Sequence, residues 1–174
     1  MSCLSNNGIV QGCNLASSGG IRNVWITGFD NIEDYDIDPA TDKITGITFK
    51  TGAELKQYDS EQQAASFSQE WEGDITSGNG GFVQNLLMRF SKLEADKRNE
   101  MRYFISTKCI AIIEDKNGKY WIAGQYGGLR PSAMMIGTGA AISELNGYEI
   151  TLSATESVVA REIEDKDVFS SNLE

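Results

Sequence analysis

The sequence predicts a mainly β protein, a β-sandwich or barrel with one flanking α-helix and one long β-hairpin. Roughly eight short segments rich in β-branched and aromatic residues recur at even spacing, and turn clusters separate them. One segment has helical spacing instead. The 18 glycines and only two prolines fit a chain with many tight turns.

The length of 174 residues predicts a single domain. Residues 1–20 are rich in Ser, Asn and Gly and have little periodicity, so we expect an irregular N-terminal arm. We expect the domain to span residues 21–163. The acidic residues 164–174 then form a tail that we expect to be frayed or bound to a partner.

Three strands are expected before the long hairpin. The first is residues 21–29, and the second contains the alternating segment 44–49, which follows a turn at residues 38–42. A third, shorter strand is expected within residues 53–58.

The long hairpin is expected within residues 64–93 and organises the rest of the fold. One parity of its first strand is apolar: Ala65, Phe67, Trp71 and Ile75. The other parity is polar and acidic: Ser66, Ser68, Glu70, Glu72 and Asp74. The second strand has an apolar parity as well: Phe82, Leu86, Met88 and Phe90. A period of two places such sets on opposite faces of a strand. The small and polar residues 76–81 between the strands supply the positive φ angles that a hairpin turn needs.

The helix is expected at residues 94–106, where Leu93, Met101, Phe104 and Ile105 lie at helical spacing. Ser91 stands three residues before Glu94, which is the spacing of a capping box. Residues 108–114 and 119–123 are expected to form a second hairpin around an Asn-Gly turn. Further strands are expected at residues 129–136, 148–154 and 157–163.

Composition argues against several functions. The net charge of −10 is opposite to what phosphate binding requires. The chain has no histidine, so its serines and its three cysteines lack the commonest activating base, and we expect no enzyme and no cofactor. Asp34, Asp36, Asp38 and Asp42 have the spacing of a calcium loop. That loop needs a glycine where Pro39 stands and an acid where Thr45 stands, so we expect no metal site.

The tryptophans, the cysteines and the membrane question each have a simple interpretation. Trp25, Trp71 and Trp121 lie at apolar parities, so we expect core packing and not a carbohydrate platform. The three cysteines have no metal-ligand spacing and are expected to be free thiols. We expect neither a signal peptide nor a membrane anchor, because the first twenty residues and the longest apolar runs lack the required patterns.

Four segments carry a resemblance that spans roughly residues 18–163. They are SGGIRNVWITGFDNI, KLEADKRNEMRYF, IAIIEDKNGKYWIAGQYGGLR and GTGAAISELNGYEITLSATE. Together they resemble structural proteins of phages that infect Bacteroidetes-type hosts, and among these the tail tube proteins. The resemblance implies a small β-sandwich or barrel that assembles into stacked hexameric rings, in which neighbouring subunits join their sheets around a lumen.

The resemblance also implies partners and a location. The chain is expected to bind copies of itself and other tail proteins such as sheath, baseplate or terminator, with DNA as a transient cargo that does not adhere. It is expected to be assembled in the host cytoplasm and to reside in the virion tail, where it serves DNA ejection.

If the chain forms such rings, two hypotheses follow for the positions of the hairpin residues. Its polar parity, Ser66, Ser68, Glu70, Glu72 and Asp74, faces the lumen, and Arg89 offsets part of the acidic charge. Its glycine-rich tip, Ser77, Gly78, Asn79 and Gly80, contacts the next ring together with the N-terminal arm.

Two alternatives remain open at this stage. The first is a connector or completion ring protein at the head–tail junction, because such proteins share fold and symmetry with tube proteins. The second is a monomeric β-sandwich that binds carbohydrate or protein, for which Glu70, Glu72 and Asp74 simply face solvent.

Overall fold

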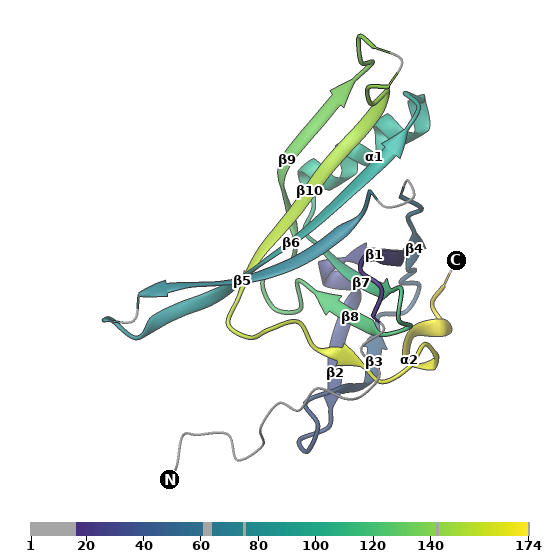
Figure 1. The fold of residues 1–174 in the computed structure, drawn as a ribbon. Helices are drawn as coiled ribbons and strands as arrows, with labels where there is room; N and C mark the ends of the chain where they lie inside the picture. Colours follow the sequence, from purple (N-terminus) through teal and green to yellow (C-terminus); the bar gives the residue numbers. More distant parts are fainter. Residues whose placement is uncertain (1–16, 61–63, 75, 142, 174) are drawn as a thin grey trace.

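Two β-sheets pack face to face in the computed structural model, with one long helix beside them (Figure 1). The structure describes residues 17–60, 64–74, 76–141 and 143–173. Strands account for 51% of the chain and helices for 12%. The predicted mainly β sandwich with a flanking helix and a long hairpin is therefore confirmed. Most of the predicted N-terminal arm lies outside the described residues.

The larger sheet has seven strands. In spatial order they are β2 (Ile32–Ile37), β3 (Ile44–Phe49), β11 (Glu162–Ile163), β8 (Tyr120–Ala123), β7 (Cys109–Asp115), β1 (Ile21–Gly28) and β4 (Lys56–Gln57). All neighbours are antiparallel except β11 and β3. β2 was not predicted, because its acidic sequence hides the alternation. The segments 53–58 and 157–163 form strands of only two residues each.

The smaller sheet has four antiparallel strands, β5 (Ser66–Asp74), β6 (Asn79–Ser91), β10 (Gly147–Glu156) and β9 (Arg130–Gly137), in that order. β5 and β6 form the predicted hairpin. Its register ends at the pair Asp74 and Asn79, so Gly80 and Gly81 belong to β6 and not to the turn. Gly78 closes the loop at a φ of 70°, a left-handed conformation that favours glycine, and its N–H donates to the Asp74 carbonyl.

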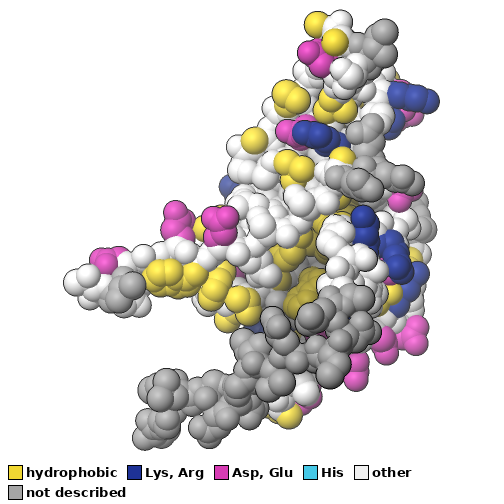
Figure 2. Space-filling view, viewed as in Figure 1, with side chains coloured by type: hydrophobic (Ala, Val, Ile, Leu, Met, Phe, Trp, Pro, Cys, Tyr) yellow, Lys and Arg dark blue, Asp and Glu magenta, His cyan; other side chains and the backbone are white. Residues whose placement is uncertain are grey.

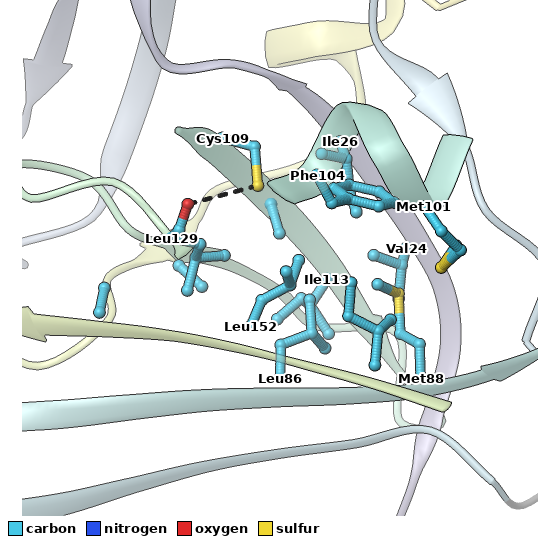
Figure 3. Close-up of a cluster of buried hydrophobic side chains, with 14 of the residues drawn as sticks. Val24, Ile26, Leu86, Met88, Met101, Phe104, Cys109, Ile113, Leu129 and Leu152 are labelled. Carbon is cyan, nitrogen blue, oxygen red and sulfur yellow. Dashed lines mark hydrogen bonds between the residues drawn. The ribbon is translucent and has the colours of Figure 1, made fainter. Parts of the chain in front are cut away.

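The main core lies between the two sheets (Figure 3). Val24 and Ile113 of the larger sheet meet Leu86, Met88 and Leu152 of the smaller one. Along β10 the buried side chains alternate with polar residues, as expected for a sheet that buries one face. The helix α1 (Ala95–Ser106) closes one end of this core with two buried side chains, Met101 and Phe104.

The predicted capping box of α1 is wrong. Glu94 is the N-cap residue, and its side chain makes no capping hydrogen bond. Lys97 instead pairs with the Glu94 carboxylate at 2.8 Å and donates to the Ser91 carbonyl at 2.7 Å. Because the helix begins after Glu94, Ser91 lies three residues before the N-cap position that the capping box requires.

A second core covers the opposite face of the larger sheet. Trp25, Ile112 and Ile122 pack there against Phe169 of the short helix α2 (Asp167–Ser170). Residues 164–173 thus differ from the frayed tail that the sequence predicts. Phe169 is fully buried, and the Leu55 N–H donates to the Asn172 carbonyl at 2.8 Å. Because β7 lies between the two cores, it reads as a continuous apolar run.

Candidate functional site

The outer face of the four-stranded sheet, the face turned away from the larger sheet, is the candidate site. It carries the polar parity of β5 and the matching positions of β6 and β10: Ser66, Ser68, Glu70, Glu72, Asp74, Asn85, Arg89, Glu149, Thr151, Ser153 and Thr155. All of these side chains are exposed or half-buried. The face is not wholly polar, since Val83, Leu87 and Met135 also lie on it.

An acidic stripe runs along the half of β5 nearest the hairpin tip. Glu70, Glu72 and Asp74 follow one another on the outer face, and their partners across β6 are Val83, Gly81 and Asn79. None of these three partner residues is a lysine or an arginine. Acidic side chains line one side of the projecting hairpin in Figure 2, and hydrophobic ones line the other.

Arg89 does not offset this stripe as predicted. It pairs across the sheet with Glu149 of β10 and contacts that carboxylate through its Nε. It lies six positions along β6 from Val83, the partner of Glu70, which is ~20 Å in an extended strand. The charge of the stripe therefore stays unbalanced within the described residues.

The hairpin tip holds itself in shape. The Asp74 carboxylate accepts the Thr76 N–H at 2.8 Å, and the Ser77 hydroxyl donates to the Asp74 carbonyl. The hydrogen bond from the Thr76 backbone holds the pKa of Asp74 below its ordinary value. Of the four predicted tip residues, Ser77 and Gly78 lie in the loop, whereas Asn79 and Gly80 form the last two pairs of the ladder.

Trp71 differs from the predicted core packing, because its side chain is 52% exposed. Its parity is the inner one, but neither sheet nor helix covers that end of the hairpin among the described residues. The indole lies across the Gly73–Gly80 pair, where a Cβ on either glycine would come within 2.7 Å of the ring. Trp25 is buried as predicted, and Trp121 is half-buried.

Two buried polar side chains and one half-buried side chain mark the border between the covered and the bare parts of the inner face. Glu156, the cross-strand partner of Phe82, accepts the N–H groups of Tyr126 and Gly127. Gln84 accepts the Gly124 N–H at 2.9 Å, and the half-buried Gln69 accepts the Ala160 N–H at 2.6 Å. These bonds tie the loops after β8 and β10 to the sheet, and beyond them the hairpin continues as two strands.

Two of the aspartates with the calcium-loop spacing already have partners within the chain. Asp38 caps its own turn by accepting from Ala40 and Thr41, while Asp42 pairs with Arg161 at 2.9 Å. Across the described residues, no three metal-ligating side chains come together. Burial raises the pKa of the Cys109 thiol to about 12, so this thiol stays protonated at neutral pH.

Among the described residues, no helix is both long enough and apolar enough to span a membrane. Comparisons with known proteins add no assignment. No family model matches the chain, and a search of curated proteins finds no match.

The contribution of β10 to the outer face was not predicted from the sequence. Glu149, Thr151, Ser153 and Thr155 alternate with the buried residues Tyr148, Ile150, Leu152 and Ala154, so the signal was present. What the alternation could not supply was the pairing of β10 with β6, which places both polar sets on one face.

Proposed function

We propose that the chain is a structural protein that assembles head to tail into rings, and that stacked rings form a tube of the phage-tail kind with the outer face lining the lumen. The observation that carries the proposal is the four-stranded sheet itself. It has an open polar face with an acidic stripe, and β5 and β9 at its edges each have one partner strand among the described residues.

The two edges are suited to pair with each other in neighbouring copies. Four strands that alternate in direction leave β5 and β9 antiparallel to one another. A copy that adds its β9 to the β5 of the next copy therefore continues the antiparallel pattern. Such a heterologous contact forms a ring when the rotation between copies closes, and the ring then has no exposed strand edges, which otherwise promote aggregation.

The offset between the two edges fits a barrel. The central residue of β5 pairs with Val83 of β6. The two central residues of β9 pair with β10 residues that in turn pair with Leu87 and Met88 of β6. The centres of the two edge strands are therefore offset by about five residues along the strand direction, which is ~16 Å. Across the strands, the four-stranded sheet is ~19 Å wide. Pairing the two edges in a flat ring then requires a strand tilt of ~40°, within the range of closed barrels. Six copies at that tilt enclose a backbone diameter of ~48 Å, which a DNA duplex can enter.

The charge of the outer face supports DNA as cargo. Glu70, Glu72 and Asp74 repeat once per copy around the ring, so the lumen wall repels phosphates. Short polar side chains such as Ser68, Ser153 and Thr155 fill the wall between the acids. A wall of this kind lets a polyanion slide and offers it no binding site.

Electron microscopy of the purified protein, with light scattering for mass, tests the proposal. We expect hollow rings or tubes, with a lumen that matches a barrel. A species of 19.1 kDa at every concentration and salt, and also in the presence of a tail template, would contradict it. A single ring that never stacks would favour the connector alternative.

The lumen assignment has its own prediction. The double variant Glu70→Lys, Glu72→Lys is expected to assemble and to retain DNA in a salt-dependent manner, because its wall now attracts phosphates. The matched control Glu70→Gln, Glu72→Gln removes the acids without adding positive charge and should retain little DNA. Filter retention of labelled duplex DNA on assembled particles measures both. Equal retention by the two variants would place the stripe outside the lumen.

A further inference from the structure

Among the described residues, neither a strand of the larger sheet nor a helix covers the inner face of the distal hairpin. Trp71, Gly73, Gly80 and Phe82 form this bare face, whose tryptophan is half exposed. The last three pairs of the ladder, from Glu72–Gly81 to Asp74–Asn79, have no third strand beside them among the described residues. A two-stranded ribbon with one apolar face is marginal on its own and gains stability when something packs on that face.

A second apolar surface lies at the opposite edge of the same sheet. A shallow recess there is lined by Leu93, Ala95, Arg98, Ile136 and Tyr148, with Glu94 at its rim. Leu93 and Ile136 are 39% and 53% exposed. This recess joins the inner face of β9 to the first turn of α1, so it sits on the same side of the sheet as Trp71.

One stripe of α1 continues this surface along the β9 edge. Ala95, Arg98, Arg102 and Ile105 follow one another at spacings of three and four, so they share a helix face. Ile105 is 64% exposed although it is fully apolar. Together with Leu93 and Ile136 these residues form the β9 flank.

We infer that the β9 flank of one copy covers the bare hairpin face of the next copy in the ring. The inference rests on the proposed function, because it uses the pairing of β9 with β5. The offset of about five residues that closes the barrel shifts the neighbour's flank toward the hairpin tip. In its own sheet Ile136 lies in register with Phe90 of β6, through Tyr148 of β10. After the shift it lies in register with Asn85 of the neighbouring copy, three residues along β6 from the Trp71–Phe82 pair. From there the neighbour's α1 stripe continues over Trp71 toward the tip.

Polarity supports the same occupant. Ile105 and Ile136 of the β9 flank are exposed apolar side chains on the inner side of the sheet, which is also the side of Trp71. A neighbour docked in this way covers Trp71 with apolar side chains, while Glu70 and Glu72 stay on the outer face.

Cysteine cross-linking tests this contact. Cys3 and Cys13 are first replaced by serine, and Cys109 is buried in the core. Trp71→Cys with Ile105→Cys, treated with a short bismaleimide, is expected to give a ladder of covalent multimers. Trp71→Cys with Ser171→Cys is the matched control, because Ser171 is exposed beside α2 and lies far from the flank; it should stay monomeric on a denaturing gel.

A second cysteine pair separates this inference from the proposed function. Ser68→Cys with Met135→Cys reports β5–β9 joining alone, since both side chains lie on the outer face. Rings with a ladder from this pair and none from the Trp71–Ile105 pair would overturn the flank contact and leave the ring in place. Absence of rings and of both ladders would overturn both.

A charge variant gives an independent measurement. Trp71→Lys is expected to raise the protein concentration needed for assembly at least tenfold, because a buried tryptophan at the centre of an interface commonly supplies that much affinity. Ser171→Lys adds the same charge at an exposed site and should leave that concentration unchanged. Circular dichroism checks that both variants are folded. Assembly of Trp71→Lys at the concentration of the parent protein would contradict the flank contact.

Discussion

The two halves of the hairpin have the same alternation but different surroundings. In the proximal half, Leu86 and Met88 are fully buried against the larger sheet and α1. In the distal half, Trp71 and Phe82 have the same inner parity, yet Trp71 is half exposed. Alternation in the sequence therefore fixes which face a side chain takes. It does not fix whether another layer covers that face, because the covering layer comes from residues distant in the chain.

The difference extends to the outer face. Opposite the covered half the outer positions include Leu87 and Arg89, and the arginine is neutralised by Glu149. Opposite the bare half stand the unbalanced acids Glu70, Glu72 and Asp74. An apolar face left in water is unfavourable in a monomer and becomes favourable when a neighbour covers it. The acids on the other face are well solvated in the monomer, and in the proposed ring they would repel DNA.

The largest expected effect compares one truncation in each half. Leu86→Ala should lower the free energy of unfolding by about 3 kcal/mol, because it leaves a cavity in the core between the sheets. Trp71→Ala should cost less than about 1 kcal/mol in the monomer, since about half of the Trp71 surface is already exposed to water. Urea unfolding at concentrations where light scattering reports a monomer measures both. Equal losses would mean that the distal face is already covered within one chain.

The border between the halves should show the next largest effect. Glu156→Leu removes the buried carboxylate that accepts the part-buried N–H groups of Tyr126 and Gly127, and the expected loss is about 2 kcal/mol. Glu156→Gln keeps one acceptor oxygen and should lose roughly half as much. The same urea measurement distinguishes them. If the glutamine variant were the less stable one, the carboxylate charge and not the hydrogen-bond geometry would anchor the loop after β8.

The sequence predicted most of this fold, because the main strands carry their own signals. The alternation of β6 and the Asn-Gly turn before β8 are local, and both gave the correct elements. β2 was not predicted because its acidic residues Glu33, Asp34 and Asp36 obscure the alternation of apolar and polar side chains. The docking of Phe169 could not be predicted, since nothing near residue 169 indicates the cavity among Trp25, Ile112 and Ile122 that receives it.

The candidate site was predicted only in part, for the same reason. The polar parity of β5 follows from its own residues, and the structure places all five on one face. The position of Arg89 and the exposure of Trp71 depend on pairing with β10 and on the extent of the larger sheet. Both are long-range properties that periodicity does not contain.

The smallest expected effect is a pKa change at Asp74, which reports whether hydrogen bonds within the turn order the hairpin tip. Hydrogen bonds, chiefly from the Thr76 N–H, hold the pKa of Asp74 below its ordinary value, so the folded state favours the charged carboxylate. The stabilisation is thus complete above the pKa of an aspartate in the unfolded chain, about 4, and is lost as the pH falls through the lower pKa of the folded state.

An NMR titration of the Asp74 carboxyl carbon should therefore give a midpoint below that of an unstructured aspartate, and the Thr76 amide should shift with the same midpoint. Asp74→Asn keeps an acceptor for the Thr76 N–H but cannot titrate in this range, so the Thr76 shift should become independent of acid pH. If the Asp74 midpoint equalled that of a free aspartate, the turn would not order the tip in the monomer. The order of the distal hairpin would then depend on a neighbouring copy, as that of its Trp71 face is inferred to do.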